Sequence, residues 1–555
     1  MNNFLTVKLK MRPNLWRPKT FGRGCLISLS VFSFSFCNQA DHRFNVEPSA
    51  DVTSLNESVD HRQISQDPWE SMQNLAESLS KGPYRQGYEP IPQILSELDY
   101  EQYRSIRYRP EKSLWRGQSP FEIQLFHLGF LYKTPVKLFI FDSNTKMLEP
   151  FKFDSNLFRY DTPAPTELNE MVSAPGYAGF RIHYPLNRPG IADEIAVFLG
   201  ASYFRLLGPG HAHGLSSRGL AINTATDMPE EFPVFTEFWL RKPVGDEKML
   251  EFYALLQSPS VTGAYKFQLG VDENTVLEVT KHLYARENIS KVGIAPLTSM
   301  FLYGPDQAPQ FDDYRPSVHD SEGLLLATND SHWEWRPLNN GKKLRLNSFP
   351  TDHLRGFGLA QRTRDFSQFL DAEALYHRRP SQWVKPRSGD WGTGKVELFE
   401  IPSLQEFADN VVAYWIPEEN ILKGDQKTYS YQLTTFDSRH PSQTLGQVKR
   451  SVTGSIGLAN QSPNSTSQNR RFVIDFENVP TITVENGINV SPELHLTSGT
   501  FSELVLIKLP FENQWRATFE FYPDTEDPST LSLFLSRDSS PVTETWSYLW
   551  EPETF

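Results

Sequence analysis

The sequence predicts an all-β protein with more than one domain. Aromatic residues make up 13% of the 555 positions, with Phe and Tyr far ahead of Trp, and 40 prolines punctuate short apolar runs. Aromatic residues favour strands, and prolines favour the turns between them. A chain of this length exceeds what a single hydrophobic core accommodates. Together these observations predict many short strands, divided between a large and a small domain.

The first 40 residues have the pattern of a signal peptide for export. An apolar stretch from Cys25 to Cys37 follows a region that is basic and contains no acid, with Lys8, Lys10, Arg12, Arg17, Lys19 and Arg23 as its charged residues. The apolar stretch is too short to span a membrane. Both cysteines of the chain lie in this segment, so we expect a mature protein without disulfides.

The formal net charge of −13 restricts the partners of the mature protein. Removal of the basic signal segment would make the charge more negative still. Nucleic acids and anionic membrane surfaces require clustered Lys and Arg, so both are excluded. No later segment contains 18 consecutive apolar residues, so we expect a soluble protein that does not span a membrane, and a neutral partner.

Residues 41–65 are polar and aperiodic, which predicts a disordered lead. The large domain is expected over 66–440. It begins with two helical patterns, Trp69–Leu79 and Ile91–Ile106, in which apolar residues recur at helical spacing. Strands then dominate the rest of the large domain.

The strand predictions follow from alternation and from turn signals. Phe121–Phe126 alternates, and Val136–Phe141 ends in an Asp-Ser-Asn-Thr sequence typical of a hairpin turn. Similar strand-like patterns occur at Phe235–Leu240, Val276–Thr280 and Lys343–Leu346.

A second, smaller domain is predicted at the C-terminus. Residues 441–470 are expected to be a linker and loop, because Ser, Thr, Asn and Gln crowd together over Val452–Asn469. Trp515–Tyr522 and Leu531–Ser536 alternate between apolar and polar residues. Six or seven short strands over about 100 residues are typical of an immunoglobulin-like sandwich. We place it at 471–555, with a start near 445 as the alternative boundary.

Two separated carboxylates are the candidates for catalysis. Asp320 ends the stretch Tyr314–Asp320, which also contains Arg315 and His319, and could act as a general base that activates water. Asp409 precedes the strand Val411–Trp415 and could be a general acid, if a like charge such as Glu406 raises its pKa. The alternatives are structural: Asp320 capping a turn or pairing with Arg315, and Asp409 in a polar turn.

Aromatic and cationic side chains between the two acids suggest a sugar-binding surface. Trp333 and Trp335 lie two positions apart, so on a strand both would face the same side. Arg379, Trp383 and Trp391 add further rings and charge. Indoles stack on the apolar faces of sugar rings, whereas Arg binds their hydroxyls. Core packing is the alternative for each Trp.

Sequence motifs for other kinds of chemistry are incomplete or absent. Gly214–Gly219 lacks the spacing of a hydrolase nucleophile elbow. His211 and His213 could face one side of a strand, but no second ligand pair with metal spacing accompanies them. No dinucleotide or phosphate-binding glycine pattern is present. We therefore expect neither a metal nor an organic cofactor.

Over residues 66–550 the chain resembles the periplasmic glucan biosynthesis proteins, the OpgG/OpgD (MdoG) family of Gram-negative bacteria. The matching segments run in order along the chain: Leu98–Arg107, Phe180–Pro185, Phe198–Arg205, Gly214–Leu220, Ser299–Gly304, Tyr314–Asp320, Trp335–Asn340, Gly356–Leu359, Arg364–Ser367, Arg379–Val384, Asp409–Asn410 and Glu544–Tyr548.

The resemblance implies a large N-terminal sandwich of galactose-mutarotase type with a long cleft, and a periplasmic location. It implies β-1,2-linked glucan as the partner and an inverting β-1,2-glucanase as the activity, with Asp409 as general acid and Asp320 as general base. Glu406 and Tyr376 match residues of the same cleft. Other members resemble transglycosylases, and a glucan-binding assembly factor for the membrane glucan synthase is a further alternative.

This sequence departs from the family pattern in three places. His213 stands where the family has an aromatic residue, and Asn223 where it has an acid. Thr393 stands where a lysine is usual. These departures leave the two acids in place. They concern the length of the products and whether the glucan is hydrolysed or transferred to another sugar.

Overall fold

The computed structural model describes residues 62–63, 67–85, 90–171, 173–305, 312–329, 332–387, 391–456, 468–480 and 490–552. The predicted signal peptide, 1–40, lies outside these residues, and so does most of the predicted lead, 41–65. Two residues of the lead, Arg62–Gln63, form strand β1, which pairs with β5 (Met147–Pro150). At its end, therefore, the prediction of disorder was wrong.

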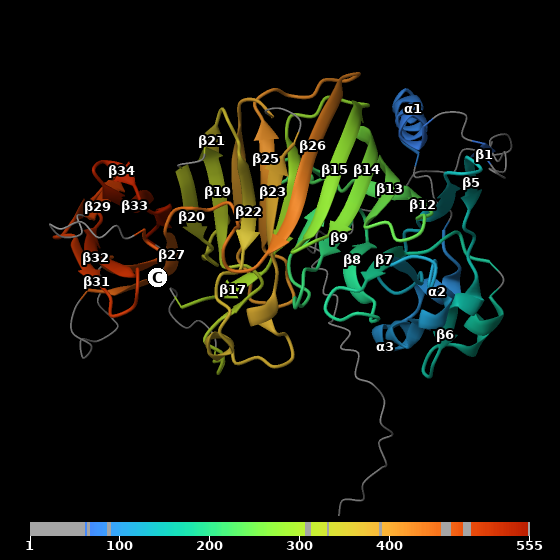
Figure 1. Ribbon diagram of the computed structural model, residues 1–555. Helices are drawn as coiled ribbons and strands as arrows, with labels where there is room; N and C mark the ends of the chain where they lie inside the picture. Colours follow the sequence, from blue (N-terminus) through green and yellow to red (C-terminus); the bar gives the residue numbers. More distant parts are fainter. Residues whose placement is uncertain are drawn as a thin grey trace, which may run out of the picture. The chain divides into compact units, whose positions relative to one another are not determined.

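Two large, mostly antiparallel sheets contain most of the strands in the described residues (Figure 1). The larger sheet contains, in spatial order, β1, β5, β4 (Lys137–Asp142), β12 (Val234–Arg241), β13 (Met249–Gln257), β14 (Val261–Val271), β15 (Thr275–Ala285), β26 (Gln426–Phe436), β23 (Ser381–Pro386), β22 (Gly356–Ala360), β19 (Gly323–Asn329), β20 (His332–Pro337), β35 (Thr545–Trp550), β33 (Ser529–Arg537) and β29 (Ser491–Leu496), with β34 (Ser540–Pro541) paired to β33. The second sheet contains β21 (Arg345–Thr351), β24 (Gly394–Glu400), β25 (Val411–Pro417), β16 (Val292–Ser299), β10 (Ser216–Arg218), β9 (Tyr203–Leu206), β8 (Asp193–Leu199), β7 (Gly179–Tyr184) and β3 (Glu122–Phe126), with β11 (Ala221–Ile222) paired to β16.

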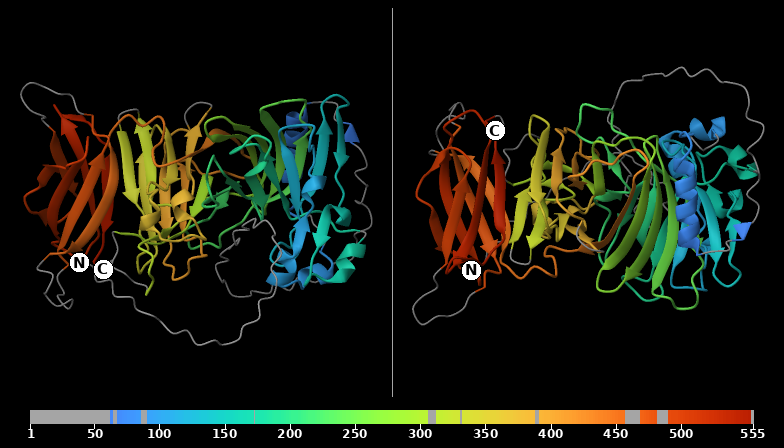
Figure 2. Two further views of the ribbon diagram at one scale, coloured as in Figure 1. Left: turned by 60° about the horizontal axis from the view of Figure 1, so that its bottom comes forward. Right: turned by 90° about the horizontal axis from the view of Figure 1, so that it is seen from above.

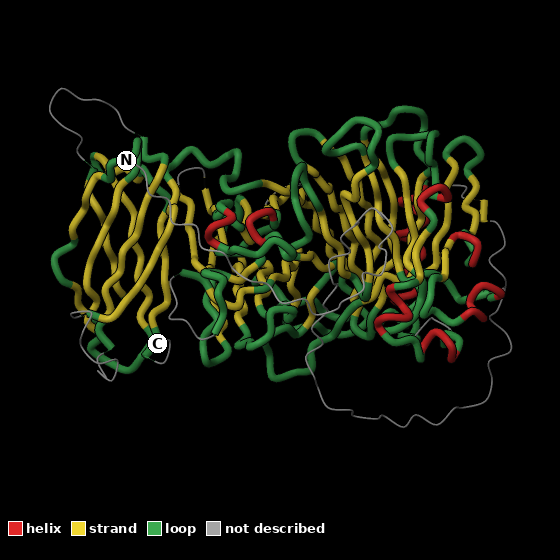
Figure 3. Tube along the Cα trace, turned by 90° about the horizontal axis from the view of Figure 1, so that it is seen from below, coloured by secondary structure: helices red, strands yellow, loops and turns green. Residues whose placement is uncertain are grey.

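The inner faces of these two sheets enclose the main hydrophobic core. Phenylalanines from both sheets meet there: Phe180 stacks on Phe198 with ring centroids 5.2 Å apart, and Phe252 meets both edge-on. Along strands such as β15 and β26 burial alternates from residue to residue, as in a two-layer sandwich, whereas β16 and β22 are buried at every position. The prediction of an all-β sandwich is confirmed, and Figure 3 shows how few helices accompany the strands.

The first predicted helix is present, and the second is divided. Helix α1 (Pro68–Ser80) packs Met72 and Ala76 against the outer side of β13 and β14 (Figure 2). The pattern over 91–106 becomes α2 (Gln93–Ser96), α3 (Tyr100–Arg104) and β2 (Ile106–Tyr108). The division occurs at Asp99, whose side chain caps α3 in a reciprocal pair with Gln102 and so begins a new helix.

Short elements complete this part of the chain. Strand β2 pairs with β6, and β17 pairs with β18. Their bounds, with those of the 3₁₀ turns, are β6 (Phe158–Tyr160), β17 (Phe301–Tyr303), β18 (Val318–His319), η1 (Pro110–Lys112), η2 (Ser155–Leu157), η3 (Thr166–Glu170), η4 (Phe366–Gln368) and η5 (Tyr376–Arg378). Of the helices in the described ranges, none has the length and apolar character that crossing a membrane requires.

A third sheet lies near the C-terminus and packs on β33 and β35 through a second core that contains Phe472, Phe519 and Trp546. Its strands are β27 (Gln447–Ser455), β28 (Arg470–Glu477), β32 (Trp515–Tyr522), β30 (Thr500–Phe501) and β31 (Val505–Lys508). The strand expected at Trp515–Tyr522 is present. The loop expected from Val452 onward starts later, because β27 continues to Ser455; residues 457–467 lie outside the described ranges.

The ten-stranded sheet has a second face, turned away from the main core, that is rich in polar side chains. Phe204 and Leu206 of β9 enter the core, so Tyr203 and Arg205 point the other way. Cross-strand pairing extends this face in both directions. Its further members are Arg181 on β7, Ser216 and Arg218 on β10, and Thr298 on β16. We call these side chains, with Tyr203 and Arg205, the polar face.

Candidate active site

One short segment, from the end of β16 into β17, anchors both candidate acids. The backbone N–H of Asp320 donates to the carbonyl of Met300 at 2.8 Å. Asn410, next to Asp409, pairs its side-chain amide with both backbone groups of Phe301, at 2.8 and 2.9 Å. Residues about 90 positions apart in sequence are thus fixed on the same three-residue stretch of backbone.

Asp409 is placed to carry a proton. Its side chain is half-buried beside the polar face. Burial raises the pKa of Asp409 above its usual range; Arg205 opposes this shift, the negative charge of Asp320 adds to it, and Arg218 opposes it. The like charge that acts on Asp409 is therefore Asp320. The expectation that Glu406 supplies it was wrong.

Glu406 is instead held as a carboxylate by Arg315. The guanidinium binds Glu406 through two hydrogen bonds of 2.9 and 2.8 Å and also contacts Asp371 at 2.8 Å. The hydroxyl of Tyr376 donates to Glu406 at 2.5 Å. The hydrogen bonds from Arg315 have the largest effect on the pKa of Glu406 and lower it, and the bond from Tyr376 lowers it further. Glu406 thus orients Tyr376 and is a poor proton donor.

Asp320 is buried, and one of its carboxylate oxygens, also buried, has no hydrogen-bond partner among the described residues. This oxygen, Oδ1, lies 3.5 Å from Nε of Arg379. Arg379 is itself fixed, because its guanidinium lies 5.0 Å from the ring centroid of Tyr376 and donates to the carbonyl of His213. The negative charge of Asp320 also contributes to the raised pKa of Tyr376, whose main cause is burial. Asp320, Arg379 and Tyr376 therefore form one cluster.

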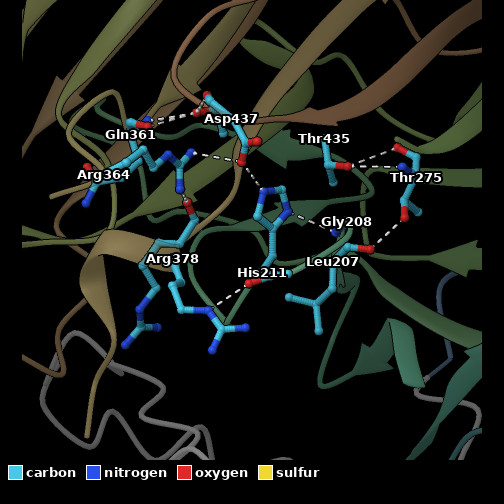
Figure 4. A network of polar contacts seen from close by, with 12 residues as sticks. Leu207, Gly208, His211, Thr275, Gln361, Arg364, Arg378, Thr435 and Asp437 are labelled. Atoms are coloured by element: carbon cyan, nitrogen blue, oxygen red, sulfur yellow. Dashed lines mark hydrogen bonds and ion pairs between the residues drawn. The ribbon is translucent and has the colours of Figure 1, made fainter. Parts of the chain in front are cut away.

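The turn η5, which precedes Arg379, is tied to the loop that follows β9 (Figure 4). His211 Nδ1 accepts the N–H of Gly208 at 3.0 Å, so Nε2 carries the ring proton and donates to Asp437 at 2.9 Å. Arg378 donates from Nε to the carbonyl of Gly210 at 2.8 Å. These bonds fix the position of the His213 carbonyl and, through it, of Arg379.

His213 is also held through its side chain. Its Nε2 lies 2.8 Å from Glu194, which in turn pairs with Arg181 of the polar face at 3.3 Å. Burial would raise the pKa of Glu194, but His213 and Arg181 outweigh it and lower the pKa to about 2. The imidazole of His213 thus brings the Glu194 carboxylate and its partner Arg181 to this side of the site.

Three functional candidates were missed by sequence reasoning, namely Tyr203, Arg205 and Arg218. Arg218 donates to Thr298 at 3.1 Å and lies 4.8 Å from the ring centroid of Tyr203. Burial raises the pKa of Tyr203 to about 12. The positive charge of Arg218 opposes this shift, and the negative charge of Asp409 adds to it. These residues lie about 200 positions before Asp409, and the only signal for them was their place in segments that resemble the family.

The tryptophans predicted to stack on sugars are packed in the protein instead. Trp333, Trp335 and Trp383 are buried in the second core, where Trp333 stacks on Trp383 with centroids 5.3 Å apart. Trp333 and Trp335 do share one face of a strand, but that face is the core face. Trp391 is half-buried and packs against Trp415. The structure therefore corrects the prediction that Trp333, Trp335 and Trp383 line a glucan surface, whereas for the partly exposed Trp391 it stays a prediction.

Two further residues predicted to bind substrate, His319 and Tyr314, differ in their exposure. His319 is buried, donates from Nδ1 to Oε1 of Gln361 at 2.9 Å, and stacks on Phe301, so it supports the position of its neighbour Asp320. Tyr314 is 75% exposed, which leaves its ring accessible. Among the described residues, no group of three or more His, Cys, Asp or Glu side chains is arranged to hold a metal ion.

Comparison with known proteins places these features in a family context. The family model described as "Periplasmic glucan biosynthesis protein, MdoG" matches residues 68–550. Similar proteins named "Glucans biosynthesis protein G" occur in Vibrio cholerae serotype O1 (39% identity, covering 86% of this chain and 85% of that protein), in Shewanella baltica (38%, 86% and 86%) and in Cereibacter sphaeroides (39%, 83% and 85%).

Proposed function

Because this chain belongs to the periplasmic glucan biosynthesis protein family, with a function in glucan biosynthesis, we propose that it is an exported periplasmic enzyme that cleaves β-1,2-glucan internally with inversion. The observation that carries the proposal is the pair of acids fixed on Ser299–Phe301, one of which has a raised pKa. Glycoside hydrolysis requires such a pair, a protonated donor and an ionised acceptor.

The two carboxyls have separate tasks in the proposed reaction. Asp409, protonated, donates its proton to the glycosidic oxygen as the bond from that oxygen to the anomeric carbon breaks. A water attacks the anomeric carbon from the opposite face, and its proton passes to the Asp320 carboxylate, directly or through a relay of water and a substrate hydroxyl. The products are a free hydroxyl and a new reducing end of α configuration. Exchange with solvent then restores both protonation states.

The surrounding residues support these tasks. Arg379 lies beside Asp320, with its Nε 3.5 Å from the carboxylate oxygen Oδ1, and so places a positive charge next to the proposed base. Asp320, in turn, opposes ionisation of Asp409 until the proton is needed. Tyr314, whose side chain is 75% exposed, offers a ring face and a hydroxyl to a glucosyl unit. Tyr376 is buried and, held by Glu406 and Arg315, supports the cluster around Asp320.

The test is an assay for new reducing ends on linear β-1,2-glucan, with the anomer of the first product read by NMR. We expect Asp409→Asn and Asp320→Asn each to reduce turnover by about 10²–10⁴-fold, as loss of a general acid or base does. Asp524→Asn, an exposed Asp on the C-terminal part of the chain, is the matched control. Full activity in Asp409→Asn would reject the acid assignment.

A second function is favoured by the names of the relatives, which refer to biosynthesis and not to degradation. In this alternative the chain binds nascent glucan delivered by the membrane synthase and guides its assembly. Tight binding of β-1,2-glucan by the unaltered protein without any new reducing ends would support it. Products with new linkages would instead indicate transfer to a sugar hydroxyl.

A further inference from the structure

A buried glutamine, Gln361, connects two segments of the candidate active site. It stands directly after Ala360, the last residue of β22, and its side chain is fully buried. Its backbone N–H donates to Ser381 Oγ at 2.9 Å, and this hydroxyl donates to the carbonyl of Asp437 at 2.8 Å (Figure 4). The backbone of Gln361 is therefore anchored on β23 and on the residue that follows β26.

The side-chain amide of Gln361 uses both of its N–H donors. Nε2 donates to the carbonyl of His319 and to the carbonyl of Tyr376, each at 3.1 Å. Oε1 accepts from Nδ1 of His319 at 2.9 Å. Because both acceptors of Nε2 are carbonyl oxygens, the orientation of the amide is fixed, and the proton of the imidazole is on Nδ1. Gln361 thus binds the residue before Asp320 through its backbone and through its ring.

The peptide unit between His319 and Asp320 is held at both of its polar groups. Its carbonyl accepts the bond from Gln361, and its N–H donates to the carbonyl of Met300 at 2.8 Å. These two groups point in opposite directions within one plane, so the two hydrogen bonds prevent that plane from rotating. The plane sets the direction in which the Asp320 side chain leaves the backbone. Loss of the bond from Gln361 therefore allows the carboxylate to move.

The second bond from the amide nitrogen fixes the cation beside Asp320. The carbonyl of Tyr376 accepts from Gln361 and also from the backbone N–H of Arg379, at 3.1 Å in both cases. Nε of Arg379 lies 3.5 Å from Oδ1 of Asp320. One buried side chain thus sets the position of the carboxylate and of its positive neighbour.

We propose that Gln361 is a positioning residue that holds the Asp320 carboxylate and the Arg379 guanidinium in the arrangement that base catalysis requires. The inference rests on the proposed function, because it assigns a task in that reaction. Gln361 is fully buried, so it acts through Asp320 and not by contact with the glucan. Its effect on the rate is expected to be large, because a displacement of about 1 Å can slow a reaction about 10²-fold.

The experiment measures kcat and KM of the full-length protein on linear β-1,2-glucan, from the rate at which new reducing ends form. Gln361→Met removes every hydrogen bond of the side chain at nearly constant size. Gln361→Glu removes the amide nitrogen with its two donated bonds. Gln447→Met is the matched control, because Gln447 is a buried amide on β27 that donates to Glu477 at 2.8 Å.

We expect kcat to fall about 10–100-fold in both Gln361 variants, with KM changed less than about twofold. KM is retained because the residues that face the glucan are unaltered. Gln447→Met should keep both constants. An active protein whose folded Gln361 variants keep the kcat of the unaltered chain would overturn the positioning role alone. An unaltered protein that forms no reducing ends would overturn the proposed function together with this role.

A double-mutant cycle with Asp320→Asn separates positioning from general structural damage. Since Gln361 acts through Asp320, we expect that adding Gln361→Met to Asp320→Asn lowers kcat by less than about a further twofold. A loss that multiplies in full with that of Asp320→Asn would overturn the proposal. Thermal unfolding shows which variants are folded at the assay temperature. If Gln361→Met is unfolded there, the nearly isosteric Gln361→Glu takes its place in the cycle.

Discussion

At the residue scale, the pKa of Asp409 links structure to activity. The proposed mechanism needs this carboxyl protonated, so activity declines as pH rises through its pKa. Arg205 lowers that pKa. We expect Arg205→Gln to raise it and to move the alkaline limb of the kcat/KM profile to higher pH. Arg181→Gln, on the same face but without influence on Asp409, is the control. An alkaline limb that stays in place or moves to lower pH in Arg205→Gln would contradict the assignment.

Lys281 is a second residue with an unusual charge state. Its side chain is fully buried, its Nζ donates to the carbonyl of Gly219 at 3.1 Å, and it lies near the rings of Tyr265 and Tyr431. Burial lowers the pKa of Lys281 to about 7. The unfolded chain therefore binds more protons than the folded one between about pH 7 and pH 10.5, so the free energy of unfolding rises with pH across this window.

We expect Lys281→Met to remove this contribution to the pH dependence and to stabilise the protein at pH 7 by on the order of 2–4 kcal/mol. Urea unfolding at several pH values from 7 to 10 measures both effects. Lys266, a partly exposed lysine on the neighbouring strand that pairs with Glu251, provides the control variant Lys266→Met. An unchanged slope of stability against pH in Lys281→Met would show that the buried amine does not titrate in this range.

At the element scale, close contacts between strands constrain the sheet that carries Arg379. Gly358 in β22 faces β23, and a Cβ there would lie 2.1 Å from the carbonyl oxygen of Gln382. Gly454 in β27 has open space at the same position. We expect Gly358→Ala to destabilise the protein by about 1–3 kcal/mol and Gly454→Ala to have no such effect. Thermal unfolding of the pair checks this, and equal melting temperatures would disprove the predicted contact.

Alternation predicted the strands well because it reflects a local property, the opposite directions of successive side chains. Trp515–Tyr522 became β32 with its predicted bounds. Helical periodicity over 91–106 did not produce a helix of that length, because the capping box at Asp99 starts a separate one. Polar composition at Val452–Ser455 did not prevent a strand, because pairing with β28 satisfies its backbone.

At the scale of the whole molecule, a buried carboxylate joins the C-terminal sheet to the large sheet. Glu544 is fully buried, accepts two hydrogen bonds from Arg362 at 2.5 and 2.8 Å, and accepts the N–H of Val448 at the start of β27. Removal of one partner from a buried ion pair leaves an uncompensated charge. Segments about 180 residues apart therefore depend on this one side chain.

We expect Glu544→Ala to lower the free energy of unfolding by about 3–5 kcal/mol. Glu287→Ala, which removes an exposed pair with Lys423, should cost less than about 1 kcal/mol. Guanidinium unfolding followed by tryptophan fluorescence compares the two variants. Similar losses in both would mean that the buried pair does not stabilise the junction.

The sequence by itself determined the all-β class, most strand positions, the membership of the family and the two acids as candidates, because these depend on local periodicity or on residues that can be compared one by one. Only the tertiary structure decided that burial raises the pKa of Asp409, that Asp320 and not Glu406 is the acid that adds to this shift, that Arg205 and Arg218 oppose it, and that Trp333 and Trp335 face a core. Burial and electrostatic interaction depend on distances between side chains far apart in the chain, and no local pattern encodes those distances.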